Sequence, residues 1–264
     1  LIYFIPLCEG IKEFVNMRFK RKFQIGVWAF CLLVAFSVHG SVRDKGYILV
    51  INSYTEGAIW SNYVIDSIRK DRSIGENVAV ESMNTLLIDD EESMRVKKDD
   101  VLSKYTELPK AIVLLGSSAW CLFEQELNGI WKDVPMILCV ENDYVAPVEA
   151  FLKKHEVIQE EKIPLLKVLG EANVSIIKCP VYIRETIEEM RLLLPDLEKI
   201  VLMSDHRYVS AQVRCQMRKV CEQYFPDLEV AYFTEGEYSL DQVLDSIESF
   251  DIQKVGLLYY SWFQ

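Results

Sequence analysis

The pattern of apolar positions predicts a chain that alternates short buried strands with amphipathic helices. Residues 48–60, I-L-V-I-N-S-Y-T-E-G-A-I-W, begin with four consecutive apolar residues and then turn polar. A short apolar run bounded by turn residues is typical of a strand buried on both faces, as in a parallel sheet. The residues after it predict a loop over 54–59 and then a helix over 63–69, with Ser61 as its N-cap.

The same rhythm recurs along the rest of the chain. Further strands are predicted at residues 78–83, 111–115, 135–140, 173–178 (as a strand or a crossover), 200–203, 228–233 and 255–259, and helices at 91–105, 120–127, 151–161, 184–194, 208–224 and 240–250. Alternation of strands and helices implies an α/β fold with parallel sheets and right-handed crossovers. We place the boundary between two lobes near residues 172–182, so that 41–172 form the N-terminal lobe and 173–264 the C-terminal lobe. Because the sequence stops just after a predicted strand, we expect the second lobe to be incomplete.

The N-terminal region has the pattern of an export signal. Met17 is followed by a basic group, Arg18 and residues 20–22, and then by an apolar run over 23–38. This pattern predicts a signal peptide over 17–40 with cleavage before Ser41, and a retained signal anchor is the alternative. Residues 1–16 then form an upstream extension. The predicted localisation is periplasmic or extracytoplasmic, with anchoring in the inner membrane left open.

Composition narrows the classes of function. The chain of 264 residues is half hydrophobic, carries 26% charged residues and has a formal net charge of −11, which argues against a nucleic-acid-binding surface. The five cysteines after the leader match no zinc or C-x-x-C spacing, and we interpret them as small buried side chains: Cys121, Cys139, Cys179, Cys215 and Cys221. The acidic run over 89–92 lacks the spacing of a calcium loop and is interpreted as a solvated helix start. No cofactor and no metal site is predicted.

Polar residues follow four of the predicted strands, where ligands of open α/β sheets are held. The first strand is followed by Ser53, Tyr54, Thr55 and Trp60, the next apolar strand by Gly116, Ser117 and Ser118, the third by Asn142 and Asp143, and the first strand of the second lobe by Ser204 and Asp205. Each loop alone is equally explained by a solvated turn or a helix cap. Four such loops at the same end of consecutive strands favour a binding site.

These motifs carry a resemblance to a known family. The stretch at 48–60, then V-L-L-G-S-S-A-W, then L-L-P-D-L-E-K-I before V-L-M-S-D, are similar to ABC-type solute-binding proteins. The same module forms the periplasmic sensor half of Bacteroidetes-type hybrid two-component histidine kinases. The resemblance implies a two-lobed type I periplasmic-binding-protein-like fold that closes on its ligand. It also implies the pocket-facing residues Ser53, Tyr54, Trp60, Ser117, Ser118, Asn142, Asp143, Asp205 and Tyr208.

Three functions therefore compete. The first is the extracytoplasmic sensor domain of a two-component histidine kinase, and the second is a free periplasmic solute-binding protein of an ABC transporter. The third is a secreted hydrolase, for which only His206 beside Asp205 offers a starting point, because the chain has no G-x-S-x-G, Walker or G-x-G-x-x-G motif. We assign no catalytic residue and predict that the chain is not an enzyme.

The predicted partners follow from the binding hypothesis. The ligand is a small molecule, with a sugar, a nucleoside-like compound and a carboxylate left open. The membrane is contacted through the parent chain, and a homodimer is also left open. We expect Trp60 and Asp205 to lie on opposite lobes and to face one cleft, and Asp205→Ala to have little effect on folding.

Overall fold

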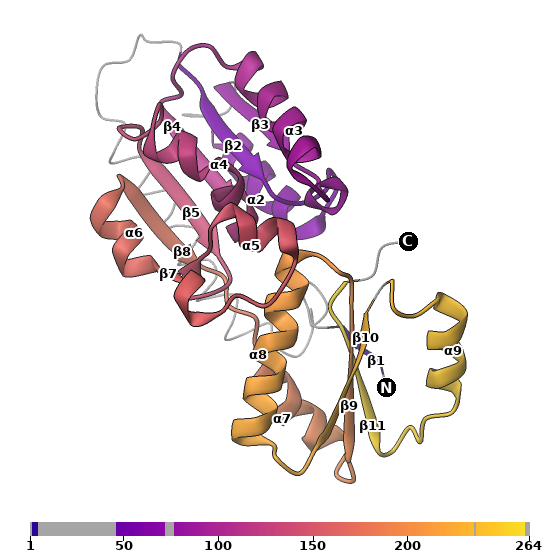
Figure 1. Cartoon of the computed structure of the whole chain (residues 1–264). Helices are drawn as coiled ribbons and strands as arrows, with labels where there is room; N and C mark the ends of the chain where they lie inside the picture. Colours follow the sequence, from indigo (N-terminus) through magenta and orange to yellow (C-terminus); the bar gives the residue numbers. More distant parts are fainter. Residues whose placement is uncertain (1, 5–45, 72–76, 235, 262–264) are drawn as a thin grey trace.

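Two parallel sheets organise the chain, and each forms the centre of one lobe (Figure 1). The computed structural model describes residues 2–4, 46–71, 77–234 and 236–261. The predicted leader lies outside these residues. The expected α/β class, with parallel sheets flanked by helices in two lobes, is confirmed.

The first lobe has a five-stranded sheet with the order β3-β2-β4-β5-β8. Its strands are β2 (Ile48–Asn52), β3 (Val78–Ser82), β4 (Ala111–Leu115), β5 (Met136–Val140) and β8 (Val174–Lys178). Leu49, Val50 and Ile51 are all fully buried. Leu49 and Ile51 pack with α3 and α4, while Val50 packs with α2 on the other face. The predicted strand with two buried faces is therefore confirmed.

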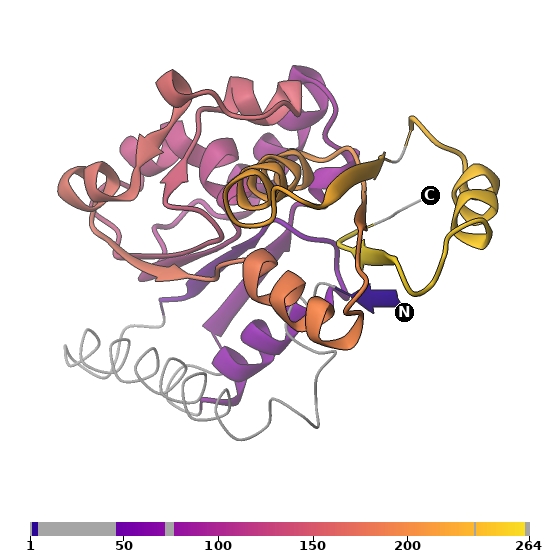
Figure 2. The same ribbon diagram turned by 90° about the horizontal axis from the view of Figure 1, so that it is seen from below.

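Helices cover both faces of this sheet (Figure 2). The helices of the first lobe are α2 (Ile59–Lys70), α3 (Glu91–Lys104), α4 (Ser117–Asn128), α5 (Val148–Lys153) and α6 (Leu165–Glu171), with the 3-10 turns η2 (Thr85–Leu87) and η3 (Gln159–Glu161). A small antiparallel pair, β6 (Tyr144–Val145) and β7 (Ile163–Pro164), lies between β5 and α6 in the chain.

The second lobe has a four-stranded parallel sheet with the order β1-β11-β9-β10. Its elements are α7 (Ile183–Leu193), β9 (Lys199–Ser204), α8 (Tyr208–Tyr224), β10 (Glu229–Thr234), α9 (Leu240–Glu248), β11 (Val255–Tyr259) and β1 (Ile2–Phe4). Ile200 and Leu202 pack toward α7 and α8, and Val201 and Met203 pack toward α9. Strand β1 lies within the stretch predicted to be an upstream extension, and it pairs with β11.

The passage between the lobes comes after β8. This strand pairs with β5 along its whole length, so the first sheet continues past the predicted boundary at residue 172. The segment 179–182 then leads to α7, whose Ile183 and Ile187 lie in the core of the second lobe.

Three predicted helices differ from the observed ones by two or more residues at their start. The first begins at Ile59 instead of after Ser61, whose hydroxyl donates to the carbonyl of Ala58 at 3.2 Å. The second begins at Ser117, directly after Gly116, so Ser117 and Ser118 lie in its first turn. The predicted helix over 151–161 is wrong: α5 ends at Lys153, because Lys154 adopts a left-handed conformation with φ 52°.

The acidic run over 89–92 starts α3, as predicted. Asp90 is the N-cap, its carboxylate accepts the Ser93 amide at 2.7 Å, and Glu91 and Glu92 occupy the first turn. Negative charge at this end of a helix is stabilised by the free N–H groups of the first turn.

Within the ranges described above, no helix combines the length and apolar character needed to cross a bilayer.

Candidate functional site

The strand order of each sheet defines one topological switch point at the carboxyl ends of its strands. In the first lobe, β3 and β4 lie on opposite sides of β2, and in the second lobe β10 and β11 lie on opposite sides of β9, so the order of strand addition reverses between β2 and β4 and between β9 and β11. Ligands of open α/β sheets bind outside the carboxyl ends of strands at such switch points. The loops that matter are therefore those after β2, β4, β9 and β11.

Ser53, directly after β2, is hydrogen-bonded to the segment that follows β4. Its hydroxyl oxygen accepts the Ala119 amide at 2.9 Å and its hydroxyl donates to the Gly116 carbonyl at 3.3 Å. Gly116 has φ +90°, and a Cβ there would lie 2.9 Å from Ser53 Oγ. Because Ser53 is only 2% exposed, its role in this structure is to hold the β2 and β4 loops in contact.

Tyr54 and Glu141 join the ends of β2 and β5. The Tyr54 hydroxyl donates to Glu141 Oε1 at 2.8 Å, and the Ser117 amide at the start of α4 points to Glu141 Oε2 at 3.4 Å. Burial raises the pKa of Tyr54 well above its usual value, and the neighbouring Glu141 carboxylate raises it further. The Tyr54 hydroxyl therefore stays protonated and acts as a donor toward Glu141.

The other predicted residues of the first lobe differ in their solvent exposure and in their distance from this pair. Trp60 in α2 contacts Tyr54 edge-on, with ring centroids 5.6 Å apart, and is half-buried against the α2 face of the core. Ser118 is buried in the first turn of α4. Asn142 is half-buried, whereas Asp143 is exposed and forms an ion pair with Lys178. Among the three residues after β5, Glu141 is the one that contacts Tyr54.

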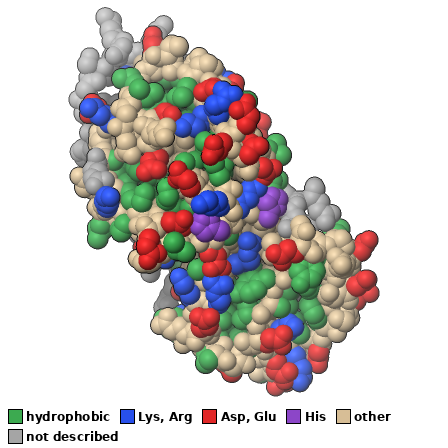
Figure 3. Space-filling view, viewed as in Figure 1, with side chains coloured by type: hydrophobic (Ala, Val, Ile, Leu, Met, Phe, Trp, Pro, Cys, Tyr) green, Lys and Arg blue, Asp and Glu red, His purple; other side chains and the backbone are tan. Residues whose placement is uncertain are grey.

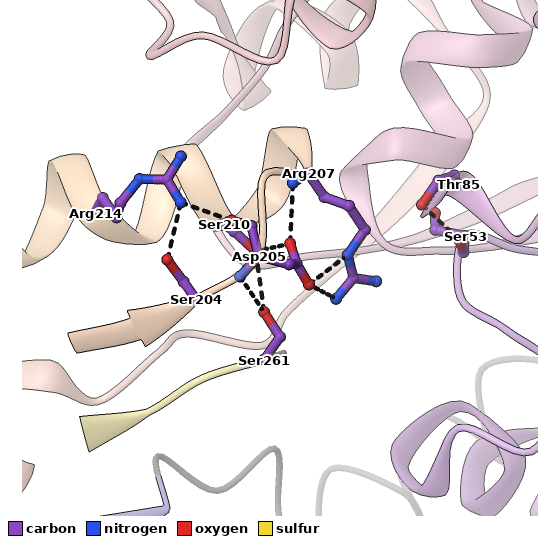
Figure 4. A network of polar contacts seen from close by, with 8 residues as sticks. All are labelled: Ser53, Thr85, Ser204, Asp205, Arg207, Ser210, Arg214 and Ser261. Atoms are coloured by element: carbon purple, nitrogen blue, oxygen red, sulfur yellow. Dashed lines mark hydrogen bonds and ion pairs between the residues drawn. The ribbon is translucent and has the colours of Figure 1, made fainter. Parts of the chain in front are cut away.

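Asp205 and Arg207 form the corresponding polar centre of the second lobe (Figure 4). Asp205, after β9, is fully buried and accepts Arg207 Nε at 2.9 Å, Arg207 Nη2 at 2.7 Å and the Ser210 hydroxyl at 2.6 Å. Arg214 reaches the Asp205 carbonyl at 2.7 Å and Ser204 Oγ at 2.9 Å. Burial opposes ionisation of Asp205, but the hydrogen bonds and the charge of Arg207 outweigh it and hold the pKa of Asp205 below its usual value.

Tyr260 responds to the charges of both polar centres. It follows β11 and is 6% exposed, and its amide donates to the Met203 carbonyl at 3.0 Å. Burial raises the pKa of Tyr260, and the Glu141 carboxylate of the first lobe raises it further, while Arg207 opposes the rise. The pKa of Arg207 in turn responds to Tyr260 and to Tyr54 of the opposite lobe.

The loops at the switch points of the two lobes therefore lie close enough for their charges to influence one another. We call their polar side chains the lobe-junction cluster: Tyr54, Glu141, Asp205, Arg207 and Tyr260. Charged side chains gather on the surface at the waist between the lobes (Figure 3). A carboxylate, a paired guanidinium and two phenols can together hold hydroxyl, amine or carboxylate groups of a small molecule.

Tyr208 has a different role from the one expected. It is 2% exposed and its ring contacts Phe151 of α5, with centroids 6.1 Å apart, within the core of the first lobe. Because α8 begins at Tyr208, the second lobe is anchored in the first by the start of this helix (Figure 1).

Sequence reasoning missed Glu141, Arg207 and Tyr260. Each directly follows or closely follows a strand, so the rule that found Asn142 and Asp205 also reaches them. The choice among consecutive loop residues depends on how each turn is built, and the sequence does not specify that. No group of three or more acidic, histidine or cysteine side chains suited to a metal ion occurs among the residues described in the structure.

Comparisons with known proteins give similarity at the level of solved structures. No family model and no curated protein sequence matches the chain. A conserved domain protein from Vibrio cholerae is similar with a TM-score of 0.47 and 13% identity, over 72% of this chain and 57% of that one. A putative LacI transcriptional regulator from Bacteroides fragilis is similar with a TM-score of 0.49 and 12% identity, over 83% and 70%.

An extracellular ligand-binding receptor from Verminephrobacter eiseniae is also similar, with a TM-score of 0.46 and 12% identity. The alignment covers 82% of this chain and 57% of the receptor. The chain thus spans little more than half the length of the first and third of these structures.

Proposed function

We propose that the chain is an extracytoplasmic domain that binds a small molecule between its lobes, at the lobe-junction cluster. The observation that carries the proposal is the electrostatic influence between the loops at the two switch points: Tyr54 of the first lobe affects the pKa of Arg207, and Glu141 affects that of Tyr260. A ligand that contacts both lobes would favour the arrangement in which they are close. Differential affinity of this kind is how binding changes a conformational equilibrium.

The sensor role belongs to the same proposal. It rests on the resemblance of the loop motifs to the sensor half of hybrid histidine kinases, and the predicted leader supports export with cleavage before Ser41. A free solute-binding protein of an ABC transporter would use the same site. The coding sequence downstream of residue 264 separates them: a membrane span followed by a kinase core supports the sensor, and a stop codon supports the free protein.

The hydrolase alternative gains no support from the site. It would require a carboxylate that orients His206, and the neighbouring Asp205 carboxylate is committed to Arg207 and Ser210. Binding without chemistry is therefore the function that these contacts favour.

A thermal-shift screen of the whole chain against sugars, nucleosides, amino acids and small carboxylates tests the proposal. A compound present at 100-fold above its Kd stabilises its binding protein by about 2.7 kcal/mol. Glu141→Gln removes the negative charge of the carboxylate that accepts the hydrogen bond from the Tyr54 hydroxyl. We expect this substitution to weaken the affinity for the compound by about tenfold or more, roughly 1.4 kcal/mol.

Asp143→Asn is the matched control, because it removes an exposed carboxylate only two residues away on the same loop. Isothermal titration of both variants should show wild-type affinity for Asp143→Asn and reduced affinity for Glu141→Gln. Equal affinities in the two variants would refute the assignment of Glu141 to the binding site.

A further inference from the structure

Two cysteines lie side by side where the chain leaves the first sheet. Cys139 is in β5, and Cys179 directly follows β8, the neighbouring parallel strand. The register pairs Val140 with Lys178, and the Cys179 amide donates to the Val140 carbonyl at 2.7 Å. The two cysteines are therefore diagonal neighbours across one strand pair.

Both side chains point to the same face of the sheet. Cys139 belongs to the apolar cluster under α2, and Cys179 packs against the same cluster together with Ile177. This follows from the period of two in a strand, which directs residues 177 and 179 to one side. The neighbouring Cys179 thiol is the main cause that raises the pKa of Cys139, and burial is the second, while the Cys179 thiol also donates to the Ile177 carbonyl at 3.9 Å.

The two thiols differ in access to solvent. Cys139 is 4% exposed, whereas Cys179 is half-buried, and both are free thiols in this structure. A reagent in solution therefore reaches Cys179 first. Cys121, Cys215 and Cys221 are buried elsewhere in the fold.

Cys179 also lies at the start of the crossover between the two lobes. From Gly46 onward, the described chain passes from the first sheet to the second only through residues 179–182. A covalent bond at Cys179 would fasten the start of this crossover to β5. It would thereby restrict the bending of residues 179–182. In this part of the described chain, these residues are the connection that must bend when the lobes move.

We propose that Cys139 and Cys179 are a redox modification site, at which a small-molecule disulfide oxidant forms an intramolecular disulfide. The Cys179 thiol loses its proton and its sulfur attacks one sulfur of the oxidant, which releases one thiolate and leaves a mixed disulfide on Cys179. The Cys139 thiol then loses its proton and attacks the Cys179 sulfur, and the second thiolate leaves. The two protons end on the two released thiols, and the cysteine pair has given two electrons to the oxidant. Export, as predicted from the leader, would place the pair where such disulfides persist.

The experiment treats the full chain with oxidised glutathione, blocks remaining thiols by alkylation and maps disulfides by peptide mass spectrometry. We expect a cross-linked peptide pair containing Cys139 and Cys179. The midpoint of thermal unfolding should rise on oxidation and return after treatment with dithiothreitol. Alkylation of both cysteines in the oxidised wild-type protein, or a stable glutathione adduct on Cys179 without the cross-link, would overturn the proposal.

Single variants separate the roles of the two thiols. Cys139→Ser should stop the reaction at the glutathione adduct on Cys179, and Cys179→Ser should leave Cys139 reduced, with no oxidation-dependent rise of the unfolding midpoint in either. Cys215→Ser is the matched control, since it removes a buried thiol on α8 and should retain the cross-link. Peptide mapping of the wild-type protein decides the proposal even if a variant fails to fold.

Discussion

At the scale of single residues, the Asp205–Arg207 pair shows how burial changes the role of a predicted site residue. The sequence places Asp205 at a strand end, where it could accept hydrogen bonds from a ligand. In the structure its carboxylate accepts hydrogen bonds from Arg207 and Ser210, and Asp205 is fully buried. A side chain held in this way positions Arg207, and its loss affects folding as well as binding.

Asp205→Asn should therefore destabilise the protein, contrary to the expectation from sequence that Asp205 matters little for folding. The substitution removes the negative charge that compensates Arg207, which is only 7% exposed. Breaking a buried pair from one side costs about 3–5 kcal/mol. Urea unfolding should show this loss, while Asp227→Asn, which breaks the more exposed pair with Arg191, should change the free energy of unfolding little. A wild-type stability of Asp205→Asn would contradict the importance of the pair.

The same pair predicts a dependence of stability on pH. The pKa of Asp205 is lower in the folded state than its usual value, so the folded protein binds the proton less readily than the unfolded chain. The contribution of Asp205 is then fully present above the unfolded pKa of about 3.9 and is lost as the pH falls through the lower folded value. The difference in unfolding free energy between wild type and Asp205→Asn should be constant near neutral pH and shrink in acid. A difference that grows in acid would show that the sign is wrong.

At the scale of elements, the turn from β4 into α4 is the one whose geometry is most demanding. Gly116 adopts φ +90° and lies against Ser53, the residue that joins the β2 and β4 loops. A side chain at this position is strained by its backbone conformation and meets Ser53 Oγ at 2.9 Å. The start of α4, which carries Ser117 toward Glu141, depends on this contact.

Gly116→Ala should lower the free energy of unfolding by about 1–3 kcal/mol, which is the usual cost of a strained backbone position. Gly170→Ala is the control, because Gly170 lies in α6, where an added Cβ meets nothing within 4 Å and alanine favours the helix. Denaturant titration of both variants checks the prediction. Equal stability of the two variants would show that the β4–α4 turn tolerates a side chain.

At the scale of the whole molecule, α8 ties the two lobes together. Its Gln212 is 3% exposed, and Oε1 accepts the Tyr144 hydroxyl at 3.0 Å and the Val157 amide at 3.2 Å, while Nε2 donates to the His155 carbonyl at 2.8 Å. All three partners belong to the first lobe, whereas α8 is part of the second. Movement of one lobe against the other must break these bonds or carry the start of α8 with the first lobe.

Gln212→Ala should loosen this contact between the lobes. Buried groups that lose their partners cost about 1–3 kcal/mol, and the affected segment is residues 144–157. Hydrogen exchange followed by mass spectrometry should show faster exchange there than in the wild-type protein. Gln216→Ala, one turn further along α8, is the control, since Gln216 donates to Val181 of the crossover and does not reach this segment. Unchanged exchange in Gln212→Ala would contradict a role of these hydrogen bonds in holding the lobes together.

The sequence by itself determined the elements whose signals are local. Ala111–Leu115, Tyr208–Tyr224 and Val255–Tyr259 have the bounds that their apolar patterns predict. A strand buried on both faces needs a continuous apolar run, and an amphipathic helix needs a repeat near 3.6 residues, so both leave a direct trace in the sequence. The carboxyl ends of these strands, and with them the general position of the candidate site, follow from the same pattern.

Only the tertiary structure decided which polar residues meet. Glu141 contacts Tyr54 while Asp143, two residues later, pairs with Lys178 on the surface. Tyr208 is buried against Phe151 at the contact between the lobes. These outcomes depend on the direction of each turn and on the packing of residues far apart in the chain. Local patterns encode periodicity and burial, whereas the partner of a side chain is fixed only when the two lobes have come together.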